Sequence, residues 1–270
     1  MTSGFVRNKM KLPSGQIDYF TAGAGHDVVY LHPASGMRVS TTLVRLAQRF
    51  RVWAPIIPGF DGTDLHDDII GMRDLADLLA AFVEDGPGRA CDIVGCSLGG
   101  WLGAWFAISY PELVENLVLS GPAGLRTADS QPLSFDPEVM RKQLYAQAEM
   151  VQQDEKTAKM RVSNGEMVSR YGLATSHDAE LQARISEISC QTLILHGTLD
   201  VRVPLEGIQM IKAKIPHSQL VYVYGAAHSL ELDQPERVSA LIEDFLLRGE
   251  AFIVNQTLPG AESATTRSAP

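Results

Sequence analysis

The 270-residue sequence predicts an α/β fold with a mainly parallel, doubly wound sheet and a helical insertion. Short β-like runs alternate with helical patterns up to residue 120 and again after residue 191, which is typical of a parallel sheet covered on both faces. Residues 28–31 and 117–119 are continuously apolar, as expected of strands that are buried on both faces. Residues 121–191 contain helical patterns and no convincing strand.

The elements follow from these patterns in chain order. The predicted strands cover residues 16–21, 28–32, 51–54, 91–94, 117–120, 192–196 and 219–224. The predicted helices outside the insertion cover residues 41–48, 72–82, 98–109 and 235–247. Within the insertion, helices are predicted near residues 137–151, 154–162, 165–171 and 178–186. We therefore expect a core (1–120 and 192–250), a helical cap (121–191) and a disordered tail (251–270) rich in small and polar residues.

Composition restricts the partners. The net charge of -9 argues against nucleic-acid or anionic-membrane binding, so we expect a small-molecule substrate, no nucleic acid and no membrane, with the oligomeric state left open. The three cysteines have no C-x-x-C spacing, which indicates neither a disulfide framework nor a zinc site and favours a cytoplasmic location. The first residues lack an apolar signal, and the longest apolar run is too short to span a bilayer.

One stretch, VGCSLGG at residues 94–100, joins a predicted strand to a predicted helix. A nucleophile at such a sharp turn has positive φ, and the residues two before and two after it must be small so that strand and helix can approach. Gly95 and Gly99 flank Ser97 in this way, whereas Cys96 lacks small flanks. Ser97 is therefore the candidate nucleophile, although the motif alone would also fit a small-residue turn or a phosphate-binding loop.

A serine nucleophile needs a base to accept its proton and a carboxylate to orient that base. Asp200 follows the strand at 192–196, and His228 follows the strand at 219–224. Because the carboxyl ends of parallel strands meet at one edge of a sheet, both side chains should lie near Ser97. Asp129 is a weaker candidate for the acid because it falls inside the cap.

The chain resembles the α/β-hydrolase superfamily over residues 16–247. The resemblance is carried by four segments: GCSLGG (95–100), PIIPGFDGT (55–63), GTLD (197–200) and AH followed by QPE (227–236). It implies a cap between strands 6 and 7 of the sheet, a chemistry that needs neither cofactor nor metal, and the use of Ser97, Asp200 and His228 as nucleophile, acid and base.

The resemblance also implies an oxyanion hole built from the backbone N–H groups of Ala34 and Leu98. The family usually has His-Gly at the start of this loop, whereas this chain has His32-Pro33, and proline has no N–H to donate. His32 and His196, at the ends of strands, are interpreted as turn-stabilising residues. No pair of histidines has a metal-ligand spacing.

We expect a serine hydrolase that cleaves a carboxylic ester or lactone of a small to medium apolar substrate. The cap is methionine-bearing and shows no evident basic cluster, so its candidate substrate contacts are Met140, Met160, Met167 and His177, with helix packing as the alternative role for the methionines. An acidic run around Asp61 is interpreted as a solvated loop.

Three other functions remain open. Carbon–carbon hydrolases of aromatic-ring catabolism share the triad and usually bind an acidic arm of the product with a cap arginine, for which Arg141, Arg161 and Arg170 are available. A hydroxynitrile-type lyase would want a lysine that the sequence does not place. A ligand-binding receptor on this fold would not need the triad, although some receptors keep it.

Overall fold

The computed structural model describes residues 4–128, 136–150, 155–171 and 173–253. Its eight-stranded sheet has the order β1-β2-β4-β3-β5-β6-β7-β8. The strands are β1 (Val6–Leu12), β2 (Gly15–Ala22), β3 (His26–Leu31), β4 (Phe50–Pro55), β5 (Cys91–Cys96), β6 (Val114–Ser120), β7 (Gln191–Gly197) and β8 (Ser218–Val223). β2 pairs antiparallel with β1 and β4, and all other neighbours are parallel. The predicted α/β fold with a mainly parallel sheet is confirmed.

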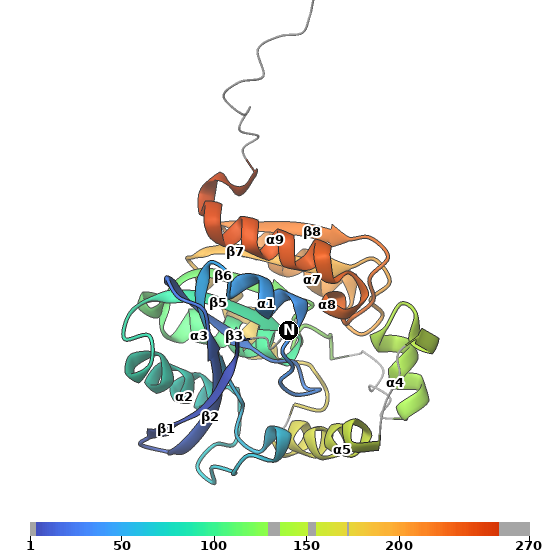
Figure 1. Cartoon of the computed structure of the whole chain (residues 1–270). Coiled ribbons are helices and arrows are strands. Elements are labelled where there is room, and N and C mark those ends of the chain that lie inside the picture. The colour runs from blue at the N-terminus through green and yellow to red at the C-terminus, as the bar shows by residue number, and fades with distance from the viewer. Residues whose placement is uncertain (1–3, 129–135, 151–154, 172, 254–270) are drawn as a thin grey trace, which may run out of the picture.

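Helices cover both faces of the sheet (Figure 1). Outside the insertion they are α1 (Thr41–Leu46), α2 (Met72–Asp85), α3 (Leu98–Ser109), α7 (Leu205–Lys214), α8 (Leu230–Asp233) and α9 (Pro235–Arg248). Val28 and Tyr30 pack with α1 and α9, whereas Val29 and Leu31 pack with α2, α3 and α7. Since successive side chains of a strand point to opposite faces, the continuous apolar run in β3 serves two cores.

The insertion between β6 and β7 is helical, as predicted. It contains α4 (Pro137–Leu144), α5 (Glu155–Arg170) and α6 (Ala179–Arg184), and α4 and α5 lie at the lower right of Figure 1, clear of the sheet. The two helices predicted at 154–162 and 165–171 are one helix, because Gly165 continues α5 instead of ending it. α5 packs against the short 3₁₀ helix η1 (Phe60–Gly62), which joins the insertion to the core.

Outside the insertion, the structure differs from the prediction at the sheet edge, at α7 and at the start of the tail. β1 was missed because its mixed, largely polar sequence forms the antiparallel edge of the sheet, where most side chains meet solvent. α7 was also missed, and it carries Gly207, which packs against the Leu125 carbonyl. The predicted tail begins too early, since residues up to 253 form the 3₁₀ helix η5 (Gly249–Ile253), in which Phe252 contacts Phe245. Residues 254–270 lie outside the described part of the chain.

None of the helices in the described ranges combines the length and the apolarity that crossing a bilayer requires.

Candidate active site

The turn between β5 and α3 presents Ser97 at the carboxyl edge of the sheet. Ser97 has φ 52° and ψ −108°, a conformation that non-glycine residues rarely adopt. A Cβ on Gly95 would lie 2.3 Å from the Gly99 carbonyl oxygen, and one on Gly99 would lie 2.1 Å from the Leu31 carbonyl oxygen. The two flanking glycines are therefore sterically required, as the spacing argument demands.

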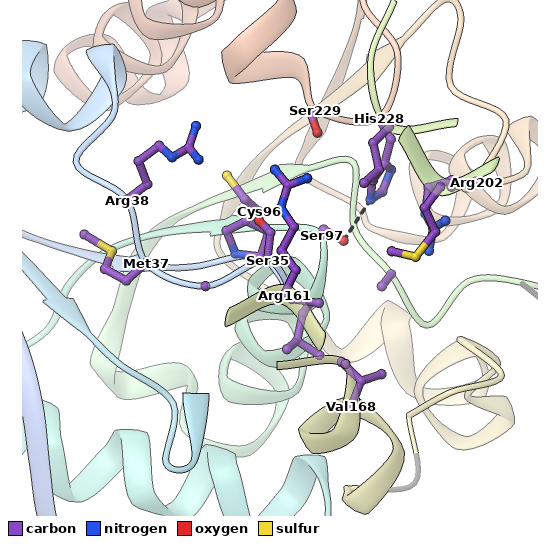
Figure 2. A pocket seen from close by; sticks show the side chains of 18 of the residues that line it. Ser35, Met37, Arg38, Cys96, Ser97, Arg161, Val168, Arg202, His228 and Ser229 are labelled. Atoms are coloured by element: carbon purple, nitrogen blue, oxygen red, sulfur yellow. Dashed lines mark hydrogen bonds between the residues drawn. The ribbon is translucent and has the colours of Figure 1, made fainter. Parts of the chain in front are cut away.

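Ser97, His228 and Asp200 form a continuous hydrogen-bonded line. Ser97 Oγ lies 2.9 Å from His228 Nε2 (Figure 2), and His228 Nδ1 lies 2.9 Å from Asp200 Oδ2. A carboxylate can only accept, so Nδ1–H donates to Asp200 and Nε2 is left to accept the serine proton. The structure thus brings Asp200 and Ser97, which lie 28 and 131 positions before His228 in the sequence, into contact with it.

The surroundings of Asp200 keep it ionised. Its side chain is fully buried, which by itself raises the pKa of the carboxyl group. His228 and the backbone N–H groups of Val203 and Arg202 oppose this, the latter two donating to Oδ1 at 3.1 and 2.8 Å, and the pKa lies below its ordinary value. Asp200 can therefore hold the histidine tautomer and stabilise the imidazolium that forms.

The oxyanion loop is held by His32. The backbone N–H of Ile57 donates to His32 Nε2 at 3.0 Å, so His32 Nδ1 carries the proton and donates to the Pro33 carbonyl oxygen at 2.8 Å. Burial lowers the pKa of His32, which is consistent with a neutral ring. Ala34 and Leu98 line the same pocket as Ser97, and across the described residues neither backbone N–H has an acceptor. They remain available to a negatively charged oxygen.

Asp61 is not the solvated residue that the sequence suggested. Its Oδ2 accepts from the Met37 N–H at 2.6 Å, at the end of the oxyanion loop. Asn164 of α5 binds it reciprocally, since Asn164 Nδ2 donates to Asp61 Oδ1 and the Asp61 N–H donates to Asn164 Oδ1, both at 2.9 Å. Asp61 has φ 53°, and Asn164 is completely buried. The oxyanion loop and the insertion are thus joined through one carboxylate.

Cys96, the neighbour of the nucleophile, is held in a protonated state. Its Sγ donates to Glu231 Oε1 at 3.3 Å, and Tyr30 donates to the other oxygen of that carboxyl group at 3.0 Å. Burial, together with the nearby Glu231 charge, raises the pKa of the Cys96 thiol well above its usual value. A thiol that stays protonated is a weak nucleophile, so Ser97 is the better candidate of the two.

A pocket of about 940 Å³ opens over Ser97 and His228, between the core and the insertion. Of the four cap residues proposed to contact substrate, Met140 and Met160 line it. Met167 does not, because its sulfur packs against Gly59 of the core. His177 also lies outside the lining, where its Nδ1 is bonded to the Arg126 carbonyl oxygen at 2.6 Å.

Arginines line this pocket, and Arg161 is one of the cap arginines that the sequence offers for an acidic substrate. Arg38, Arg161 and Arg202 reach it from the core and from α5 (Figure 2). Arg161 donates to the Tyr145 hydroxyl at 2.6 Å and lies over the Tyr145 ring. Arg38 and Arg202, which the sequence analysis did not single out, lie in core loops far apart in the sequence. For Arg202, its position two residues after Asp200 is a sequence signal that could have predicted a place in the pocket.

A possible metal-ligand group lies elsewhere. Within the described chain it consists of His26, Asp92 and Glu115, whose ligand atoms lie within 4.8 Å of one another. These residues lie at the amino ends of β3, β5 and β6, the edge opposite to Ser97. His26 Nε2 is 3.3 Å from Asp92 Oδ2, and this contact raises the pKa of His26, so an ion pair accounts for the group.

The fold and the site define the class of protein: a hydrolase of α/β fold with a serine, a histidine and an aspartate in line. A model of the alpha/beta hydrolase family matches residues 19–241. The chain belongs to that family.

Two kinds of hydrolase are among the similar sequences. The chain is 26% identical over 223 residues to a pimeloyl-[acyl-carrier protein] methyl ester esterase of Yersinia enterocolitica, covering 74% of this chain and 84% of the relative. It is 29% identical over 265 residues to a 2-hydroxy-6-oxo-2,4-heptadienoate hydrolase of Pseudomonas putida, covering 88% and 95%.

Solved structures show the same fold. A thermophilic esterase from Thermogutta terrifontis superposes with a TM-score of 0.72 at 23% identity, covering 90% of this chain and 98% of the other. A meta-cleavage product hydrolase from Pseudomonas fluorescens superposes with a TM-score of 0.74 at 22% identity, covering 89% and 97%.

Proposed function

We propose that the protein hydrolyses a carboxylic ester or lactone of a small to medium substrate through an acyl-enzyme on Ser97. The observation that carries this proposal is the line from Asp200 through His228 to Ser97, whose hydroxyl opens into the pocket. This order of acceptor and donor is what activates a serine for attack on a carbonyl carbon.

The mechanism follows from the geometry. His228 Nε2 takes the Ser97 proton as Oγ attacks the carbonyl carbon, and Asp200 stabilises the imidazolium. The carbonyl oxygen becomes an oxyanion that the N–H groups of Ala34 and Leu98 bind. His228 then gives the proton to the leaving oxygen, and the alcohol departs. Water, activated by the same histidine, attacks the acyl-enzyme and releases the acid.

The walls of the pocket support a substrate with an apolar part. Leu144, Met160 and Val168 of the insertion line the pocket, as does Trp101 of α3. The volume of about 940 Å³ lies near the upper end of the range for pockets that hold one drug-sized molecule, so the pocket has room for a substrate of medium size. The esterases among the similar sequences add support for ester cleavage.

A carbon–carbon hydrolase is the second candidate. Arg161 brings a positive charge from the insertion into the pocket, as binding of an acidic ring-cleavage product requires, and a 2-hydroxy-6-oxo-2,4-heptadienoate hydrolase is among the similar sequences. The hydrogen bond between the Ser97 hydroxyl and His228 suits ester hydrolysis as well as carbon–carbon bond hydrolysis, so it does not separate the two reactions.

A substrate panel separates the two candidates. Purified protein is assayed with short-chain p-nitrophenyl esters, with lactones and with ring-cleavage dienones, beside Ser97→Ala. We expect esters or lactones to be cleaved by wild type alone. Cleavage of a dienone with no turnover of any ester or lactone would replace the proposal with the carbon–carbon hydrolase.

A further inference from the structure

Arg202 belongs to the same loop as the triad acid and reaches the catalytic pocket. Its backbone N–H donates to Asp200 Oδ1 at 2.8 Å, and its side chain lies beside His228 (Figure 2). The guanidinium Nη1 donates to Gln143 Oε1 of α4 at 3.2 Å. The loop that orients the catalytic histidine therefore also places a cation at its side.

The charge of this guanidinium is not neutralised by a direct ion pair. Within the described ranges no carboxylate oxygen lies within ion-pair distance of it, whereas Arg7 and Arg141, which also line the pocket, are paired with Asp18 at 2.7 Å and Glu138 at 3.0 Å. The chain has 32 acidic residues and a net charge of -9, so the missing ion pair at Arg202 does not reflect a shortage of carboxylates.

The environment of Arg202 is unfavourable for an isolated cation. Burial lowers the pKa of Arg202, the Asp200 charge opposes this effect, and the nearby positive charge of Arg126 adds to it. A partly buried charge is retained only where something compensates its lost hydration. A guanidinium carries five N–H donors in a fixed plane, and Gln143 accepts from only one of them, so a planar anion could take two more.

We propose that Arg202 binds a carboxylate of the substrate, on the part of the molecule that leaves with the proton from His228. His228 Nε2 must reach the leaving oxygen, so the leaving group passes next to this histidine, and Arg202 lies at its side. The substrate class is an ester whose alcohol part carries a carboxylate. This inference rests on the ester hydrolysis proposed above.

The test compares two esters that differ only in charge on the leaving group. Wild type, Arg202→Gln and Arg202→Lys are assayed with 4-acetoxybenzoate and 4-acetoxybenzamide, and the ratio of their kcat/KM values is compared between proteins, which cancels the difference in leaving-group reactivity. We expect this ratio to fall about tenfold or more in Arg202→Gln, the size of a lost charge-assisted hydrogen bond, and less in Arg202→Lys. The matched control is Arg170→Gln, an exposed cap arginine outside the pocket lining, which should keep the wild-type ratio.

Two results would overturn the assignment. The ratio could be the same in Arg202→Gln as in wild type, or it could fall in Arg161→Gln instead, which would place the carboxylate site on α5.

A second measurement needs no variant: 4-hydroxybenzoate should inhibit labelling of wild type by a fluorophosphonate at lower concentration than 4-hydroxybenzamide, and equal inhibition would contradict the proposal. If neither ester is cleaved but 4-hydroxybenzoate still inhibits labelling at lower concentration than 4-hydroxybenzamide, the proposed ester hydrolysis is wrong and the carboxylate site at Arg202 is supported.

Discussion

Among single residues of the candidate site, the sequence predicted the geometry of the turn at Ser97 best. The constraint is local, because Gly95 and Gly99 must leave room within two residues of Ser97. Asp200 and His228 were found by topology, since each follows a strand that ends at the same edge. The role of Asp61 was missed because its partner Asn164 lies 103 residues away, and nothing near Asp61 in the sequence indicates that contact.

Asp200→Asn tests the orienting role at this scale. The amide cannot act as an anion toward the imidazolium, and its NH₂ favours the wrong histidine tautomer, so we expect kcat to fall about 10⁴-fold with the fold intact. Steady-state kinetics on the best ester of the panel measures this, with circular dichroism as the control for folding. A loss below about tenfold would mean that Asp200 does not orient the base.

At the level of helices and strands, the sequence predicted the sheet well. For the insertion it predicted only that the segment is helical. Alternating strands and helices identify a parallel sheet, but the polar edge strand β1 has no apolar signal of its own. In the insertion, the sequence indicated helices without showing which faces meet the pocket. Met140 and Met167 look alike in sequence, yet only Met140 lines the pocket, because α5 turns Met167 toward Gly59 of the core.

Asn164→Ala tests the joint between α5 and the oxyanion loop. It leaves the Asp61 N–H and one carboxylate oxygen without their partner, so we expect a loss of about 1–3 kcal/mol in the free energy of unfolding together with a lower kcat/KM. Urea denaturation and ester kinetics measure the two effects. Ser163→Ala, a half-buried neighbour on the same helix that does not line the pocket, is the matched control. Equal stability and activity in both variants would show that this contact does not support the site.

At the level of the whole molecule, the buried carboxylate of Asp27 connects several elements at the edge of the sheet opposite to Ser97. Asp27 has no exposed surface and accepts from Arg51 Nη2 at 2.8 Å, Arg89 Nη2 at 3.0 Å and Trp53 Nε1 at 2.8 Å. Burial by itself raises the pKa of Asp27. The hydrogen bonds from the three donors lower it by more, so that the pKa is about 2, below its ordinary value of 3.8. These contacts join β3 and β4 to the loop before β5, at the edge opposite to Ser97.

This carboxylate makes stability depend on pH in a defined direction. The pKa of Asp27 is lower in the folded chain than its ordinary value of 3.8, so its contribution is complete above that value and disappears as the pH falls toward about 2. We expect Asp27→Asn to cost about 1–2 kcal/mol at pH 6, allowing for the half-exposed guanidinium groups, and progressively less below pH ~4. Urea denaturation of both proteins across this range measures it. A difference that grows on acidification would contradict the assignment.

Intact-mass labelling with a fluorophosphonate tests most directly whether Ser97 is an activated nucleophile in the folded protein. Wild type, Ser97→Ala and His228→Ala are incubated with the reagent and weighed. We predict one adduct on wild type and none on either variant within the same time. An unlabelled wild type, or a His228→Ala protein that labels as fast as wild type, would contradict the account and favour a protein that binds ligands without turning them over.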